Sequence, residues 1–195
     1  MNCCGIILAA GASRRMGRAK ALLAWEGETF LDRLIGVMSE SCQNVMVVLG
    51  HRAAEIRAGL RRNAAFVTNP DPERGQLSSL QCALAALPDN YDAFLFTPVD
   101  YPAISAATIS TLVAALSAHG ESLVAIPRHD GRRGHPVACR AALAPEFLAL
   151  PPTAKASDII HAHISETLYL DVPDTGILTD IDDPQAYEAL LASRA

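Results

Sequence analysis

Four basic side chains lie close together in a glycine-containing segment that follows the first apolar stretch of the chain. Within residues 14–20 the cations are Arg14, Arg15, Arg18 and Lys20, with no acidic residue among them. The whole chain of 195 residues, by contrast, carries a formal net charge of -5. Small residues let backbone N–H groups approach a ligand, and fixed cations attract phosphate groups. The segment therefore predicts a local anion-binding site that does not reflect the general charge.

The spacing of the glycines excludes two familiar phosphate-binding motifs. Residues 8–20 read LAAGASRRMGRAK. The P-loop requires four residues between its two glycines and a Lys directly after the second glycine. Here five residues separate Gly11 from Gly17, and Arg18 follows Gly17. The dinucleotide fingerprint G-x-G-x-x-G fails because Ser13 stands where its second glycine should be. This failure also disfavours a Rossmann oxidoreductase. An isolated basic run is most often a solvated loop, so the rest of the chain decides between the two interpretations.

The composition predicts a globular protein that forms a single domain over residues 1–195. Half of the residues are apolar and 19% are charged, which is ordinary for a soluble domain. The negative balance argues against a nucleic-acid partner. Five cysteines without CxxC spacing predict free thiols in a reducing compartment. In residues 3–20 the positive charges follow the apolar run, unlike in a signal peptide, and polar residues within 101–120 exclude a membrane span. We therefore expect a cytoplasmic protein without a membrane partner.

Short apolar runs alternate with amphipathic stretches along the chain. Strands are expected at residues 4–9, 45–50, 65–68, 93–99, 123–127, 135–140 and 168–172. Helices are expected at residues 30–40, 53–61 and 78–86, after Ser105, and after the Asp183–Pro184 pair. Continuous apolar strands that alternate with helices predict an α/β fold with a mostly parallel central sheet and helices on both faces. Ligands of such sheets bind beyond the carboxyl ends of the strands. This rule selects residues 10–20, 69–79, 100 and 130–135.

Five segments, in order over almost the whole chain, carry a recognisable pattern. They are Leu8-Ala9-Ala10-Gly11-x-Ser13-x-Arg15-Met16-Gly17-x-x-Lys20, Gly75-Gln76-Leu77-Ser78-Ser79-Leu80, Val99-Asp100-Tyr101-Pro102, Gly131-Arg132-Arg133-Gly134-His135-Pro136-Val137, and Asp180-Ile181-Asp182-Asp183-Pro184 with Tyr187. Together they resemble the molybdenum-cofactor (MobA-like) nucleotidyltransferase family and are most similar to its molybdopterin cytidylyltransferase branch. The resemblance implies a three-layer, Rossmann-like nucleotidyltransferase fold. It also implies an enzyme that transfers a nucleoside monophosphate from an NTP to a phosphorylated acceptor and releases pyrophosphate.

The resemblance assigns roles to the charged residues of these segments. It implies that Arg15 and Lys20 are the catalytic cations, because they would bind the triphosphate and stabilise the leaving pyrophosphate. Asp100 and Asp182 resemble the ligands of a Mg²⁺ ion that bridges two phosphates, and Asp180 is the rival for the second position.

The resemblance also implies which residues bind the two substrates. The nucleotide-binding residues would be Leu8, Ala9, Ala10, Gly11, Ser13, Gly75, Ser78 and Ser79. Ser78 and Ser79 are also expected to open a helix, where one of them could act as the cap. Arg133 is the candidate for the acceptor's phosphate. We expect His135 to orient its loop, because a phosphate that is already ionised needs no general base.

Other polar residues in or near these segments are not expected to take part. Arg14 and Arg18 fall on variable positions of the first motif and are expected to be solvated. Asp183 is expected to be a helix cap. His161 and His163 are expected to be surface residues, because side chains two apart on a helix point about 200° away from each other.

The identity of both substrates is less constrained than the reaction. The L-A-A-G segment is similar to that of the cytidylyl branch, whereas the guanylyl branch usually has L-A-G-G. The extra methyl group of Ala10 would limit how close a purine base can lie to the backbone. CTP is therefore favoured. The family's G-D-x-G-A-R segment is replaced at residues 152–158, where Lys155 takes the place of the Arg. Molybdopterin is the expected acceptor, with a sugar phosphate or an isoprenoid-precursor phosphate as alternatives.

A rival from another functional class is a non-catalytic nucleotide-binding chaperone that delivers a cofactor to its target enzyme. Such a protein would need the basic loop but not both carboxylates, so the presence of Asp100 and Asp182 favours an enzyme. The resemblance to molybdenum-cofactor enzymes implies a molybdoenzyme or its maturation factor as the protein partner.

Overall fold

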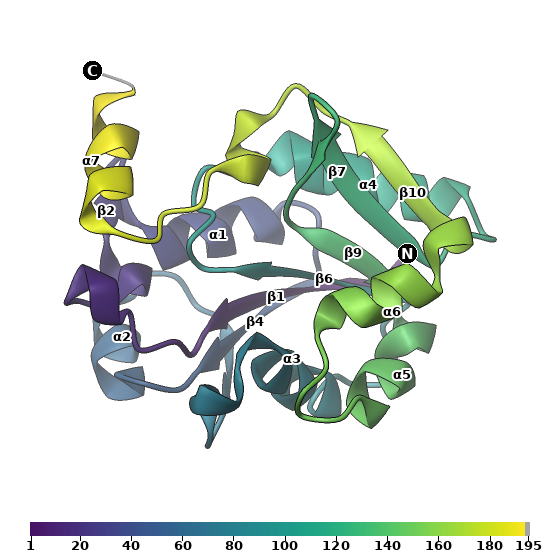
Figure 1. Ribbon diagram of the computed structural model, residues 1–195, viewed down its shortest axis with the longest axis horizontal. Helices are drawn as coiled ribbons and strands as arrows, with labels where there is room; N and C mark the ends of the chain where they lie inside the picture. The colour runs from purple at the N-terminus through teal and green to yellow at the C-terminus, as the bar shows by residue number, and fades with distance from the viewer. Residues whose placement is uncertain (194–195) are drawn as a thin grey trace.

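The computed structural model describes residues 1–193 and is built around one main sheet (Figure 1). The strand order is β10-β7-β9-β6-β1-β4-β5, and β8 pairs with β7. The strands are β1 (Cys3–Ala9), β4 (Asn44–Leu49), β5 (Ala65–Thr68), β6 (Ala93–Pro98), β7 (Val124–His129), β8 (Arg132–Arg133), β9 (Val137–Arg140) and β10 (Thr167–Asp171). β9 runs antiparallel between β6 and β7, whereas β1 is parallel to both of its neighbours. A separate two-stranded hairpin consists of β2 (Ala24–Trp25) and β3 (Glu28–Thr29).

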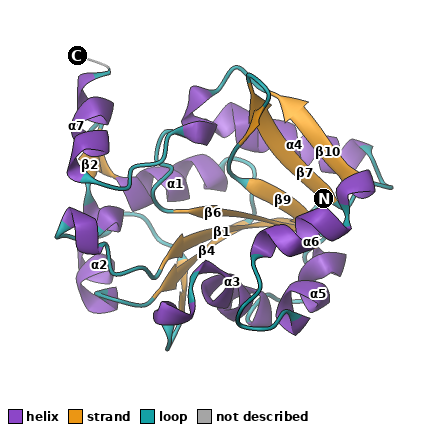
Figure 2. Ribbon diagram, in the orientation of Figure 1, coloured by secondary structure: helices purple, strands orange, loops and turns teal. Residues whose placement is uncertain are grey.

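Helices cover both faces of this sheet, so the fold has three layers (Figure 2). One face packs against α1 (Phe30–Ser39), α2 (Ala53–Gly59), α4 (Ala106–Ala118) and α7 (Pro184–Ala192). The other packs against α3 (Gln76–Ala85), α5 (Ala144–Ala149) and α6 (Ala156–Ala162). Side chains alternate along β1, so Cys3 and Ile7 join the first core and Cys4 and Ile6 the second. The predicted mostly parallel α/β sheet with helices on both faces is confirmed.

Some local predictions require correction. Helix α3 begins at Gln76, with Gly75 as its N-cap, so Ser78 and Ser79 lie within its first turns and do not open it. Gly75 has a φ of 91°, which an L-residue rarely adopts and which ends the preceding turn. The hairpin and the helices α5 and α6 were not expected.

The order of the strands reverses beside β1. The chain passes from β1 to β4 and β5 on one side, and β6 pairs with β1 on the other side. The loop after β1 and the turn after β6 therefore emerge next to each other, which is where open α/β sheets bind ligands. All five cysteines are free. Among the described residues, no helix has the length and apolar character needed to cross a membrane.

Candidate active site

A network of charged side chains occupies this switch point. The Lys20 ammonium lies 3.0 Å from Oδ2 of Asp100 and 2.5 Å from Oδ1 of Asp182. Arg15 contacts the other oxygen of Asp182 at 2.8 Å. Only 11% of the Lys20 side chain is exposed, whereas the Arg15 side chain is 69% exposed. The network therefore joins the loop after β1, the end of β6 and the segment before α7, which lie far apart in the sequence.

A third carboxylate completes this cluster. Asp100, Asp180 and Asp182 each offer an oxygen, and these oxygens lie within 4.8 Å of one another. The segment is held against β6 because the Ile181 N–H donates to the Asp100 carbonyl at 2.9 Å. Ile181 is buried in the core, so its two neighbours point to the opposite side, toward the site. Asp180 and Asp182 are therefore both available to one cation and need not be rivals.

The carboxylates and cations shift one another's pKa values. Burial, followed by the charges of Asp100 and Asp182, raises the pKa of Asp180 to about 6. The hydrogen bond from Lys20 is the main cause that lowers the pKa of Asp182. Burial by itself would lower the pKa of Lys20, but Asp100 and Asp182 together raise it above its ordinary value. The site thus has a surplus of negative charge, since three carboxylates face two cations.

Asp180→Asn is expected to change how the stability of the metal-free protein depends on pH. The pKa of Asp180 is about 6 in the fold against an ordinary 3.8, so the unfolded chain releases this proton first as the pH rises. The free energy of unfolding therefore falls between these two pH values and is then constant. In thermal unfolding with EDTA, the variant should gain stability over the wild type at about pH 7 but not at about pH 4. An equal difference in stability between the variant and the wild type at both pH values would contradict the raised pKa of Asp180.

The loop between β1 and β2 forms a cavity of about 320 Å³. Its residues are Gly11, Ala12, Ser13, Arg14, Arg15, Lys20, His51, Pro72, Glu73 and Asp182. The loop is closed by Ser13, whose hydroxyl accepts from the Lys20 N–H at 3.1 Å. At Gly11 a Cβ would meet no atom within 4 Å, so the backbone faces open space there. Arg14 is largely exposed and pairs with Glu73 at the rim, in agreement with its expected solvation.

A neighbouring cavity of about 280 Å³ extends under the carboxyl ends of β1 and β6. Of the eight expected nucleotide-binding residues, its lining includes Leu8, Ala9, Ala10, Gly11, Ser13, Gly75 and Ser79. Ser78 is not among the lining residues. The Asn69 amide donates to the hydroxyls of Ser78 and Ser79 at 2.9 and 3.0 Å, which ties the beginning of α3 to the residue after β5. Asn69 lies in the segment 69–79 that the strand-end rule selected, but no role for its side chain was predicted.

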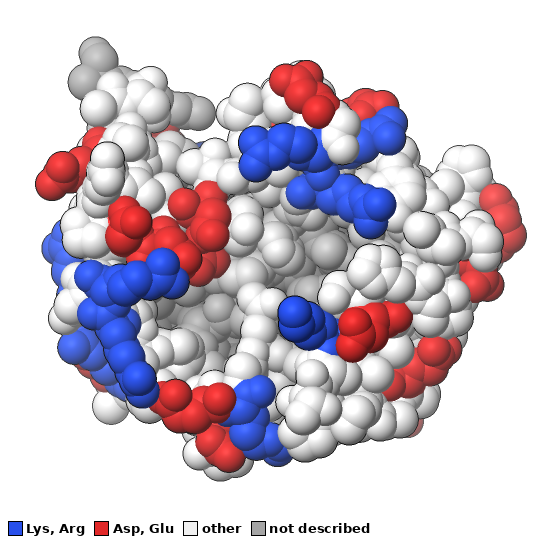
Figure 3. Space-filling view, in the orientation of Figure 1, with Lys and Arg blue, Asp and Glu red and all other residues white. Residues whose placement is uncertain are grey.

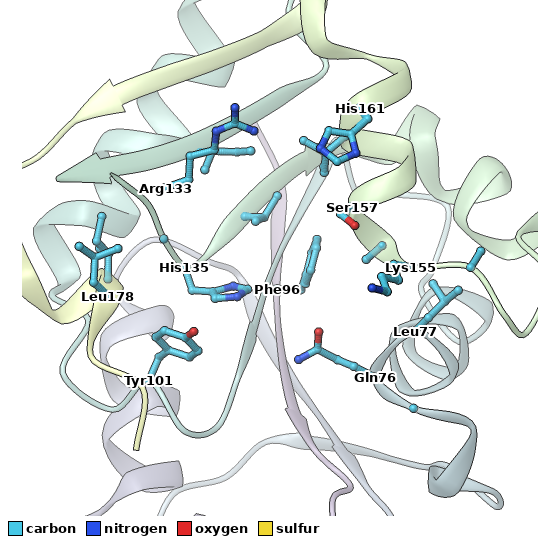
Figure 4. A pocket seen from close by; sticks show the side chains of 18 of the residues that line it. Gln76, Leu77, Phe96, Tyr101, Arg133, His135, Lys155, Ser157, His161 and Leu178 are labelled. Atoms are coloured by element: carbon cyan, nitrogen blue, oxygen red, sulfur yellow. The ribbon is translucent and has the colours of Figure 1, made fainter. Parts of the chain in front are cut away.

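A larger pocket of about 750 Å³ opens beside these two (Figure 4). Tyr101 and His135 stand on one wall, and Gln76 and Lys155 stand on the opposite wall. Phe96 of β6 lies between the two walls. In Figure 3 the same face of the molecule is hollowed at its centre, with Lys, Arg, Asp and Glu side chains along the rim. Both expected acceptor-binding residues, Arg133 and His135, line this pocket.

The environment of His135 differs from that of an exposed histidine. Burial is the main cause that lowers its pKa to about 4, so the ring is neutral at physiological pH. The ring lies 4.6 Å from that of Tyr101, and its Nδ1 is buried without a hydrogen-bond partner. Arg133, in β8, stacks over the ring of Tyr169 with its guanidinium carbon 4.8 Å from the ring centre.

The predictions for the two histidines at the end of α6 were incomplete. His163 is not a free surface residue, because its side chain is only 19% exposed and contacts Glu146 and Glu166, each at 2.8 Å. These contacts raise its pKa, first through Glu146 and then through Glu166. His161 is exposed but lines the large pocket. The helical spacing of the two side chains predicted their opposite directions but not what each one would meet.

Residues 5–167 match the family model described as the MobA-like NTP transferase domain. The chain belongs to the MobA-like NTP transferase family. The molybdenum cofactor cytidylyltransferase of Escherichia coli K12 is 28% identical over 184 residues, which cover 93% of this chain and 92% of that protein. The nicotine blue oxidoreductase of Paenarthrobacter nicotinovorans is 35% identical over 150 residues, covering 72% of each chain.

The crystal structure of Rv0371c from Mycobacterium tuberculosis H37Rv superposes on this MobA-like chain with a TM-score of 0.87, at 25% identity over 98% of both chains. A second structure of that protein, in complex with manganese, gives a TM-score of 0.83 at 23% identity, covering 99% of this chain and 100% of that one.

The expected family and the expected nucleotidyltransferase class are confirmed. The names of the relatives include both nucleotidyltransferases and an oxidoreductase.

Proposed function

We propose that this MobA-like NTP transferase is a Mg²⁺-dependent cytidylyltransferase that transfers CMP from CTP to the phosphate of molybdopterin and releases pyrophosphate. The observation that carries the proposal is the Lys20–Asp100–Asp182 network at the junction of the cavities. The name of the Escherichia coli relative, which aligns over 93% of the chain, favours the same reaction. The cytoplasm, where reduced thiols persist, is the expected location.

The three cavities suit the three parts of such a reaction. The triphosphate would occupy the 320 Å³ cavity, where Arg15 and Lys20 can donate to its oxygens. The base and ribose would occupy the 280 Å³ cavity beside Ala10 and Ser79, and the acceptor the 750 Å³ pocket. An acceptor oxygen could then attack the α-phosphate while pyrophosphate leaves toward the two cations. Positioning and charge stabilisation carry this reaction, and no covalent enzyme intermediate is needed.

The acidic cluster fits a hard divalent cation. Asp100, Asp180 and Asp182 would hold it, and their surplus negative charge over Arg15 and Lys20 matches what a cation would neutralise. Mg²⁺ is bound through few carboxylates together with phosphate oxygens and water, and when bound it withdraws charge from the phosphates under attack. The manganese complex of the Mycobacterium tuberculosis neighbour lends support to a divalent metal in this fold.

Ala10→Gly is expected to shift nucleotide selectivity toward GTP. Ala10 is buried and lines the 280 Å³ cavity proposed for the base and ribose. Removal of the methyl should let a purine lie closer, and the ratio of kcat/KM for GTP to that for CTP should rise about tenfold, as for one methyl group in a selective pocket. Ala12→Gly, in the phosphate cavity, controls for loop flexibility and should leave the ratio unchanged. An unchanged ratio for Ala10→Gly would remove the basis for preferring CTP.

Pyrophosphate release tests the proposal. Each of the four NTPs is supplied with Mg²⁺, with and without molybdopterin, and the release is followed with a coupled assay. We expect release with CTP that requires molybdopterin. Release that requires a sugar phosphate or an isoprenoid-precursor phosphate would retain the reaction class and replace the acceptor. Tight CTP binding without turnover on any acceptor would favour the chaperone, and an absence of nucleotide binding would contradict the proposed function.

A further inference from the structure

The base cavity and the acceptor pocket meet at the beginning of α3. Among the described residues, only Gly75 and Gln76 line both the 280 Å³ cavity and the 750 Å³ pocket. Gly75 has no side chain, so Gln76 supplies the one side chain that reaches both compartments. The two substrates of a transfer reaction must touch each other where their compartments meet. A ligand group at this junction will therefore contact Gln76.

The Gln76 amide is free to bind a ligand. The side chain is exposed, makes no hydrogen bond to another described residue, and points into the pocket in Figure 4. An amide offers two donors and one acceptor.

A second unpartnered group faces Gln76 from the opposite wall. His135 is half-buried as a residue, but its Nδ1 atom is buried and has no hydrogen-bond partner. In the tautomer that carries its proton on Nε2, the neutral imidazole can accept a hydrogen bond at Nδ1. Figure 4 shows His135 and Gln76 on either side of Phe96, both directed toward the middle of the pocket. A buried polar atom without a protein partner is uncommon, and such an atom is available to a bound ligand or water.

The remaining lining defines the class of compound that these two groups would bind. Phe96 and Tyr101 contribute aromatic rings, which suit a planar ligand. The charged lining residues are all basic, namely Arg74, Arg132, Arg133 and Lys155. No described carboxylate lines the pocket, although the chain as a whole is acidic. The pocket therefore suits an anion that carries a planar ring.

We infer that Gln76 and His135 select the acceptor: Gln76 donates to its phosphate where the two substrates meet, and His135 accepts a hydrogen bond from the edge of its planar ring. This inference rests on the proposed function, because it takes the large pocket as the acceptor site. It assigns to Gln76 a role in acceptor specificity that the neighbouring nucleotide site does not require.

The test for Gln76 measures the binding of molybdopterin by titration calorimetry. Gln76→Met keeps the length of an exposed side chain and removes its hydrogen bonds, so Kd should rise about tenfold. Gln185→Met makes the same change at an exposed position early in α7, outside the pocket, and should bind like the wild type. CTP binding by Gln185→Met should equal that of the wild type, and the change in CTP affinity of Gln76→Met should be smaller than its change in molybdopterin affinity. Equal molybdopterin Kd values for wild type and Gln76→Met would overturn the role of Gln76.

The test for His135 compares two replacements in the same titration. In His135→Asn the amide oxygen can take the place of the Nδ1 lone pair, so Kd should stay within about threefold of the wild type. His135→Leu removes the acceptor and should weaken binding about tenfold or more. Thermal unfolding of both variants shows whether the fold is retained. Equal molybdopterin Kd values for folded His135→Leu and folded His135→Asn would overturn the role of His135.

Failure of this inference can be separated from failure of the proposed function. If wild-type protein binds molybdopterin in a Gln76-dependent manner but releases no pyrophosphate from CTP, the selective pocket stands and the proposed reaction falls. If CTP is consumed with another phosphate while molybdopterin does not bind, the reaction class stands and the inference is overturned. If the wild type neither binds molybdopterin nor consumes CTP, both are overturned.

Discussion

Asp100→Asn is expected to lower kcat for pyrophosphate release from CTP by about a thousandfold, the scale of losing one preorganised charge contact at a reacting phosphate. The carboxylate lies at the end of β6, within reach of Asp180, Asp182 and the Lys20 ammonium. The amide keeps the shape of the side chain but removes the negative charge that a divalent cation needs. The loss should appear in kcat more than in KM for CTP, because the contacts with base and ribose remain.

The matched control is Asp130→Asn. Asp130 also follows a strand, β7, but it is exposed and lies outside the carboxylate cluster. Its φ of 48° is one that Asn tolerates well, so the fold should be unaffected. Steady-state kinetics over a range of Mg²⁺ concentrations measure both variants. Activity of Asp100→Asn within about tenfold of the wild type would be inconsistent with the metal-ligand role.

Lys20→Met is expected to have a second large effect, with two components of opposite sign. Catalysis should fall by about two to three orders of magnitude, because the cation that would stabilise the leaving pyrophosphate is gone. Divalent metal should bind the nucleotide-free protein more tightly, because Nζ no longer competes for Asp100 and Asp182. A merely structural lysine would not produce this combination.

Arg18→Met serves as the control for Lys20→Met. Arg18 belongs to the same loop, but it is exposed and lies over the ring of Tyr187, with its guanidinium carbon 5.3 Å from the ring centre. Its replacement should change neither kcat nor metal affinity by more than about twofold. The kinetics are measured as before, and Mn²⁺ binding is followed by calorimetry. Weaker metal binding by Lys20→Met, or equal losses of activity in the two variants, would contradict the role of Lys20.

The sequence was sufficient to predict the layers and the edge at which the site forms. The apolar runs that became β1, β4, β6 and β7 are continuous because helices cover both sides of each strand. The rule that the carboxyl ends of parallel strands meet at one edge of the sheet predicted that Lys20 and Asp100 lie close together, and the two side chains are in contact. Local patterns suffice for such features, because the features depend only on the spacing of apolar residues within one element and on the direction of the strands.

Other features depend on contacts between distant segments, which no local pattern encodes. Asp180 and Asp182 are both directed toward the site because Ile181 is anchored to β6, although their i, i+2 spacing in an extended segment was an available signal. The large pocket forms where β6, the β8–β9 segment, α6 and the beginning of α3 converge, so no local pattern could identify Tyr101 and Gln76 as its walls.

Transfer of radiolabel from CTP carrying ³²P at its α-phosphate to molybdopterin is the most direct test of the central claim. The wild-type protein is incubated with Mg²⁺ and both compounds, and the products are separated and counted. We expect the label to move into a molybdopterin product, with one pyrophosphate released for each transfer and no transfer by Asp100→Asn. Label that stays in CTP, or that appears only as free CMP, would contradict nucleotidyl transfer to this acceptor.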